Sequence, residues 1–231
     1  MKQRLVLAVL IAGLTGCSSV RQTPDEKPLA KIEPLLVSYA AMDPASQYNH
    51  LVAELRVVGA ALQAYSQKHN GQLPPRLTTL VRESYLPAST LISSADPSDG
   101  KEGGVPDSYR EWSQSAETDE VGSSFLYEFS EAPCKWDWKS YLGGHPSLTD
   151  VDANRDGTVS WSEAKSWQLN HGDVIQQPNS KPYSKSGFPV VRCYWYLYPN
   201  AYTNAAGRTV LNLAADLQTV FASQAWWEKD H

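Results

Sequence analysis

Oxygen-bearing side chains recur at fixed positions in one twelve-residue stretch of the chain, 152–163. They occupy its places one, three, five, seven, nine and twelve: Asp152, Asn154, Asp156, Thr158, Ser160 and Glu163. Ca²⁺ takes about six to eight oxygen ligands in flexible geometry, which short side chains, the carbonyl of Thr158 and a bidentate Glu163 can supply. Gly157 at place six permits the sharp turn that such a ring of ligands needs. The sequence therefore predicts Ca²⁺ as a cofactor of this stretch.

The same spacing resembles the EF-hand calcium loop at every constrained place, including the apolar Val159 at place eight. The resemblance implies an exiting helix, for which residues 164–169 are suitable. Gly143, Gly144 and Pro146 oppose a regular entering helix. Because the chain carries one such loop, we expect a structural Ca²⁺ with a dissociation constant of about 10⁻⁴ to 10⁻³ M. The alternative interpretation is an acidic surface turn, in which Asp, Asn and Gly are also common.

The beginning of the chain predicts its location. A basic start and a short apolar run, 5–14, indicate a secretory signal, because the run is too short to span a membrane. The following Leu-Thr-Gly-Cys resembles the bacterial lipobox, which implies cleavage before Cys17 and attachment of lipid to that residue. Ser18 after the cysteine points to the outer membrane. We therefore expect an outer-membrane lipoprotein of the bacterial envelope, facing the periplasm or the surface; the alternative is a soluble secreted protein.

Composition limits the remaining chain. An apolar content of 42% supports a real core, and the net charge of −5 provides no basic surface for nucleic acid. Beyond Cys17, the only cysteines are Cys134 and Cys193. An oxidising compartment favours a disulfide between them over two thiols. Such a bridge would connect the segments before and after the predicted calcium loop.

The pattern of apolar residues predicts an α+β domain, with one long helix packed on an antiparallel sheet. Asp43 and Pro44 are a typical helix start, and Asn70-Gly71 is a typical stop. Between them one face is apolar at helical spacing: Leu51, Leu55, Val58, Leu62 and Tyr65. Strands are predicted at 124–129 and 190–198, and a hairpin at 210–214 and 219–222.

Residues 55–75, which end in Asn-Gly-Gln-Leu-Pro-Pro, resemble pilin-like proteins such as the pseudopilins of type II secretion. The resemblance covers about 45–100 and 187–228 and implies a pilin-like head. The apolar half-helix through which pilins polymerise is missing, and a lipobox stands in its place. The predicted organisation is a signal peptide (1–16), a lipidated cysteine with a flexible tether (17–42), and a pilin-like domain (43–231) with an EF-hand-like insertion at about 140–172.

Catalytic spacing is not found: the histidines lack a zinc-protease motif, and there is no nucleophile elbow or phosphate-binding loop, so we do not expect an enzyme. The chain has eight tryptophans. Trp136, Trp138 and Trp161 lie in or beside the insertion, where exposed indoles would bind a glycan or a protein. The alternative is that they pack as a small core beneath the loops. The leading prediction is a calcium-binding interaction domain; the others are an aromatic binding module and an accessory of a secretion or pilus-like system.

Overall fold

The computed structural model describes residues 38–105, 122–174, 181–196 and 209–224. The predicted signal peptide, Cys17 and the tether up to residue 37 lie outside the described residues. Residues 38–42 were predicted to belong to the tether, but they form part of the domain. Tyr39–Ala41 is a 3₁₀ turn, η1, and the carbonyl of Tyr39 accepts a hydrogen bond of 3.1 Å from the Gln47 side chain. The domain therefore begins before Asp43.

Helix α1, Pro44–Lys68, begins and ends where its local sequence dictates. Asp43 caps its start: Oδ1 accepts hydrogen bonds from the backbone N–H groups of Ala45 (3.0 Å) and Ser46 (3.1 Å). Beyond its end, Asn70 and Gly71 take positive φ angles of 54° and 87°, which turn the chain out of the helix. The predicted apolar face is buried: Leu51, Leu55, Val58, Leu62 and Tyr65.

Four antiparallel strands form one sheet in the order β1-β2-β3-β4. They are β1 (Leu126–Tyr127), β2 (Pro189–Cys193), β3 (Thr209–Ala214) and β4 (Val220–Gln224). The α+β class is therefore confirmed. The first two strands are shorter than predicted, whereas β3 and β4 form the predicted hairpin, with Leu213 opposite Val220 next to the turn.

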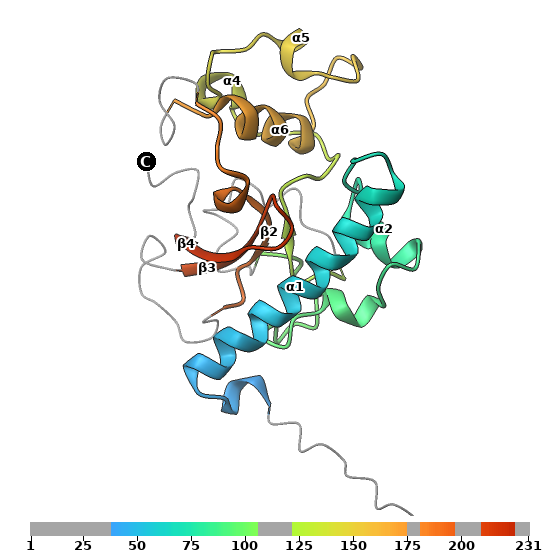
Figure 1. Ribbon diagram of the computed structural model, residues 1–231, viewed down its shortest axis with the longest axis vertical. Helices are drawn as coiled ribbons and strands as arrows, with labels where there is room; N and C mark the ends of the chain where they lie inside the picture. The colour runs from blue at the N-terminus through green and yellow to red at the C-terminus, as the bar shows by residue number, and fades with distance from the viewer. Residues whose placement is uncertain (1–37, 106–121, 175–180, 197–208, 225–231) are drawn as a thin grey trace, which may run out of the picture. The chain divides into compact units, whose positions relative to one another are not determined.

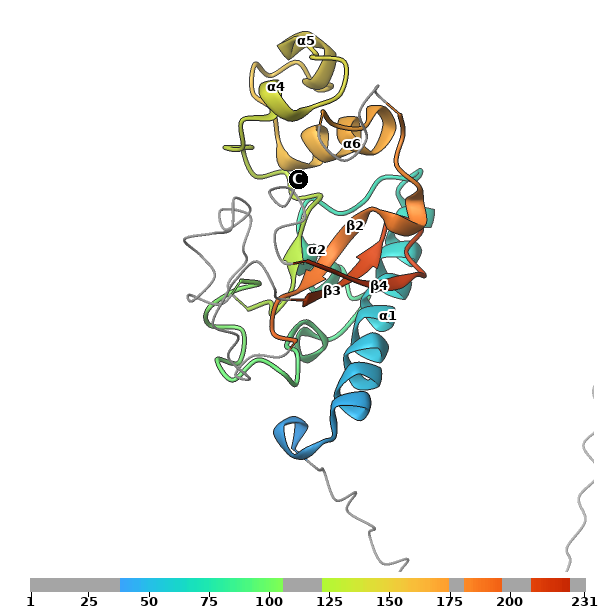
Figure 2. The same cartoon turned by 90° about the vertical axis from the view of Figure 1, so that its left-hand side faces the viewer.

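The main core lies between α1 and the sheet (Figures 1 and 2). Apolar side chains of β2 and β3, such as Val191 and Leu213, pack there with the buried face of α1. Gly59 allows a close approach, because a Cβ at this position would lie 2.6 Å from the carbonyl oxygen of Leu217. Short elements surround this core: α2 (Leu77–Arg82), η2 (Ala88–Leu91) and η4 (Lys185–Gly187).

The insertion carries a second, smaller core beneath three helices: α4 (Trp138–Tyr141), α5 (Leu148–Val151) and α6 (Trp161–His171). In both views these helices gather at the end of the unit opposite η1. Trp136, Trp138 and Trp161 are only 5%, 7% and 1% exposed, and the rings of Trp136 and Trp161 are stacked with centroids 6.3 Å apart. Of the two interpretations of these indoles, packing as a small core agrees with the structure, because the three rings are too buried to form an exposed binding surface.

The predicted disulfide is also corrected. Cys134 and Cys193 are both thiols, because they pack in different places: Cys193 lies in β2 inside the main core, whereas Cys134 contacts the core of the insertion. Complete burial raises the pKa of the Cys193 thiol to about 12. The insertion is therefore attached to the sheet without a covalent bridge between these residues.

Among the helices of the described segments, none combines the length and the apolar character needed to cross a bilayer.

Candidate calcium site

Two capped helices flank the predicted calcium loop. Before the loop, α5 makes a single turn whose start is a capping box between Ser147 and Asp150. After it, α6 starts at Trp161 and is capped by Ser160. The exiting helix was predicted from the sequence, and it is longer than the predicted segment 164–169. The one-turn entering helix was not predicted; the signal for it is Ser147 followed three residues later by Asp150.

The first half of the loop is folded by carboxylate and amide oxygens that accept backbone N–H groups. Asp152 accepts at Oδ2 from Gly157 (2.9 Å) and at Oδ1 from Asp156 (3.2 Å). Asn154 Oδ1 accepts from the same Asp156 N–H at 2.8 Å. Arg155 and Gly157 take positive φ angles of 60° and 87°, so the expected sharp turn at Gly157 is present. These bonds bring places one, three and five close together.

Asp156 is held in its ionised form. Its Oδ1 accepts from the Thr158 hydroxyl (2.6 Å) and from the Thr158 N–H (2.8 Å). These two bonds, the hydroxyl bond first, lower the pKa of the Asp156 carboxyl below its ordinary value. Since the carboxyl is already acidic, a negative charge is present at place five throughout the physiological pH range.

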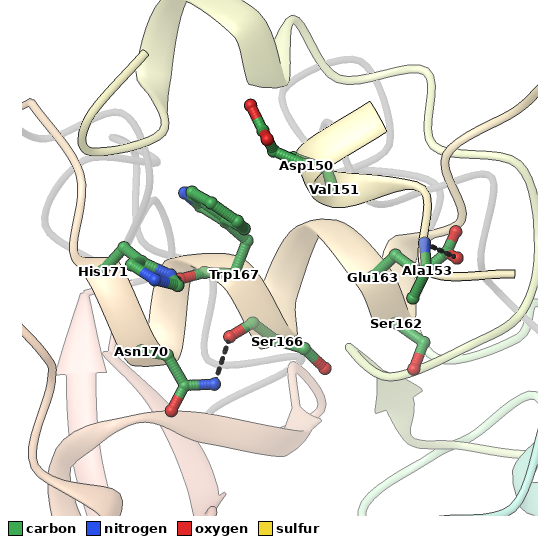
Figure 3. A pocket seen from close by; sticks show the side chains of 9 residues that line it. All are labelled: Asp150, Val151, Ala153, Ser162, Glu163, Ser166, Trp167, Asn170 and His171. Carbon is green, nitrogen blue, oxygen red and sulfur yellow. Dashed lines mark hydrogen bonds between the residues drawn. The ribbon is translucent and has the colours of Figure 1, made fainter. Parts of the chain in front are cut away.

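Glu163 at place twelve joins the two ends of the loop. Its Oε1 accepts from the N–H groups of Ala153 (2.9 Å) and Asn154 (3.2 Å), and the first of these bonds is drawn in Figure 3. Its Oε2 accepts from the N–H (2.9 Å) and the hydroxyl (3.0 Å) of Ser160. Ser160 Oγ in turn accepts from the Glu163 N–H, which completes a capping box at the start of α6. The last predicted ligand therefore also fixes the direction of α6.

Residues 132–134, which precede the insertion, pair with the end of the loop and the start of α6. The carbonyl of Val159 accepts from the Cys134 N–H at 2.7 Å, and Pro133 forms a β-bridge with Ser160. The Trp161 N–H donates to the carbonyl of Ala132 at 3.0 Å. The Val159 side chain is buried in the core of the insertion, as its apolar character at place eight predicts. The second half of the loop is thus fixed to the rest of the domain by backbone bonds and by packing.

Five of the six predicted ligand residues line one pocket of about 470 Å³: Asn154, Asp156, Thr158, Ser160 and Glu163. Gln72, Glu131 and Pro133, which lie outside the loop, also line it. The sixth predicted ligand residue, Asp152, is only 5% exposed and does not line this pocket. In the part of the chain that the structure describes, no three His, Cys, Asp or Glu side chains are arranged to hold a metal ion.

The residues present nevertheless fit Ca²⁺ chemically, because every donor in the loop is an oxygen and three of them are carboxylates. Asp152 accepts one hydrogen bond at each carboxylate oxygen, so each retains acceptor capacity for a cation. Glu163 accepts two at each oxygen and would have to exchange some of them. A cation in this loop would therefore require rearrangement of the hydrogen bonds around Glu163.

One group of polar residues near the loop was missed from the sequence. Lys165 on α6 lies 3.4 Å from Oε2 of Glu128, and Arg192 on β2 lies 3.3 Å from Oε1 of the same residue. All three side chains are fully buried. The available signal was a charge inside an apolar run: Glu128 stands between Tyr127 and Phe129, and Arg192 follows Val191. Buried charges occur only when they are paired, so such positions indicate partners elsewhere in the chain.

Comparisons of the chain with protein-family models, with curated proteins and with solved structures find no match.

Proposed function

We propose that the chain is a calcium-binding lipoprotein of the bacterial envelope, in which one Ca²⁺ in the loop 152–163 stabilises a pilin-like interaction domain. The observation that carries the calcium proposal is the pocket lined by five of the six residues that the sequence selects as ligands. A long helix packed on an antiparallel sheet agrees with the pilin-like resemblance.

Stabilisation follows from where the ligands come together. Asp152, Asp156 and Glu163 place three negative charges within twelve residues, and Arg155 supplies the one positive charge in that stretch. A bound divalent cation would neutralise the excess. Because an unfolded chain does not gather these oxygens, binding to the folded loop adds to the free energy of unfolding.

A structural role suits the packing of α6 better than a sensor role. Sensor EF-hands open on binding Ca²⁺ and expose an apolar groove. Here the inward side of α6 is already packed in the domain, with Trp161, Ala164 and Gln168 at most 2% exposed. Opening would remove Trp161 and Ala164 from the core of the insertion at a large loss of apolar burial. We therefore propose that Ca²⁺ fixes the insertion in place and does not open it.

The membrane anchor is proposed from the lipobox-like sequence at Cys17. From Cys17 to Ser38, where the described domain begins, a fully extended chain reaches about 70 Å. A lipid on Cys17 would thus keep the domain close to the membrane surface and leave the loop accessible to Ca²⁺ of the surrounding compartment.

Terbium luminescence tests the site. Tb³⁺ replaces Ca²⁺ at oxygen sites and is sensitised by a nearby indole, and Trp161 stands at place ten of the loop. We expect emission excited through tryptophan that Ca²⁺ displaces and Mg²⁺ displaces much less. Asp152→Asn should abolish it, whereas Asp137→Asn, at an exposed carboxylate outside the loop, should preserve it. Equal emission from the wild-type protein and Asp152→Asn would refute the assignment.

A further inference from the structure

Three fully buried charges connect α6 to the sheet. Lys165 comes from α6, Glu128 directly follows β1, and Arg192 lies in β2. Glu128 pairs with Lys165 through Oε2 at 3.4 Å and with Arg192 through Oε1 at 3.3 Å. A single carboxylate is thus shared by a cation of the insertion and a cation of the sheet.

The contacts continue in both directions. Arg192 Nε donates to Asn212 Oδ1 on β3 at 3.0 Å, and Asn212 Nδ2 donates to the hydroxyl of Ser223 on β4 at 2.9 Å. On the other side, the Lys165 ammonium lies over the rings of Trp136 (5.1 Å) and Trp161 (5.6 Å) in the core of the insertion. One series of polar contacts therefore runs from the small core, through Glu128 at the end of β1, to β2, β3 and β4.

Lys165 links this series of contacts to the calcium loop, because it lies on the same helix as Glu163. Lys165 follows Glu163 by two residues on the same helix, and the backbone of a helix moves as a unit. Removing one partner of a buried ion pair leaves an uncompensated charge, so the pair tolerates little displacement of α6. The Glu128–Lys165 pair thus restricts where the helix can place Glu163.

We propose that the Lys165–Glu128–Arg192 cluster couples the calcium loop to the sheet, so that calcium affinity depends on this buried pairing. The inference rests on the proposed calcium site and adds a positioning residue, Lys165, that is not a ligand. If the ion pairs of Glu128 hold the loop in its calcium-binding geometry, weakening these ion pairs lowers the affinity for Ca²⁺. Coupling between two sites is reciprocal, so bound Ca²⁺ strengthens the ion pairs by the same factor.

The test measures the calcium dissociation constant of the folded full chain for Lys165→Met and for Glu128→Gln. We expect both variants to bind at least about fivefold more weakly, the lower end of ordinary coupling. If the two variants acted only through long-range electrostatics, they would change the calcium affinity in opposite directions, because loss of a cation favours Ca²⁺ and loss of an anion disfavours it. Lys139→Met is the matched control: Lys139 also lies over an indole of the insertion, that of Trp138 at 5.4 Å, but is exposed.

Each outcome decides a different claim. If the wild-type protein binds no Ca²⁺, the proposed function and the coupling are both refuted. If it binds but either variant weakens less than fivefold, or the two change in opposite directions, only the coupling is refuted. If a variant fails to fold, the coupling is tested on the wild-type protein by NMR. Addition of Ca²⁺ should shift the signals of Arg192 Nε–H and of the Asn212 side-chain amide. Signals that do not move would overturn the coupling.

Discussion

Replacing Glu163 by glutamine separates the two roles that the structure gives this residue. Glu163 accepts four hydrogen bonds at its two oxygens. Glutamine has one accepting oxygen and an NH₂ group, which would meet N–H donors at the other position. We expect the loss of this cap to lower the free energy of unfolding by about 0.5–2 kcal/mol without Ca²⁺.

The calcium response supplies the larger signal. At a free Ca²⁺ concentration about a hundredfold above the dissociation constant, the wild-type domain should gain about 2.7 kcal/mol. For a domain of this size each kcal/mol raises Tm by about 2–4 °C, so the expected shift is about 5–11 °C. Glu163→Gln should lose most of it, because glutamine cannot supply a bidentate charged ligand.

Thermal unfolding followed by circular dichroism, with Ca²⁺, with Mg²⁺ and with chelator, measures both effects. Asp137→Asn is the control, since Asp137 is an exposed carboxylate outside both the loop and its pocket. It should respond to Ca²⁺ as the wild-type protein does. A calcium shift in Glu163→Gln equal to that of the wild type would show that Glu163 is not a ligand. A wild-type Tm that is the same in Ca²⁺ and in chelator would show that the domain gains no stability from Ca²⁺.

Further predictions concern the other parts of the chain. Asp43→Ala should lower the free energy of unfolding by about 1 kcal/mol, measured by urea denaturation, because it removes the cap of α1. In the native protein at pH 8, iodoacetamide should label Cys134 well before Cys193, which is fully buried and has a pKa of about 12. After denaturation without reductant, both cysteines should react with iodoacetamide. If neither reacts, a disulfide joins them. Cys17→Ala should release the protein from membranes into the soluble fraction, and persistent attachment would indicate another anchor.

Local signals in the sequence were sufficient for several elements of the fold. The N-cap at Asp43, the turn at Asn70-Gly71 and the hairpin of β3 and β4 each depend on a few neighbouring residues, and the structure has all three. The ends of β1 and β2 were not predictable in this way. A strand exists only where a partner pairs with it, and β1 pairs with β2 over just two residues.

Contacts between distant segments decided what the local sequence left open or predicted wrongly. The pattern of tryptophans does not tell an exposed face from a small core; stacking of Trp136 on Trp161 across the insertion made it a core. The two cysteines were assigned to one bridge from compartment chemistry, but tertiary packing separates them. The cluster around Glu128 joins residues 37 and 64 positions apart in the chain, a distance over which no local pattern operates.

Calorimetric titration of the full chain with Ca²⁺, and separately with Mg²⁺, measures directly whether the loop 152–163 is a calcium site. We expect one Ca²⁺ per chain with a dissociation constant of about 10⁻⁴ to 10⁻³ M, and much weaker binding of Mg²⁺, which demands a near-ideal octahedron. The absence of saturable binding of Ca²⁺, or equal binding of the two ions, would contradict it.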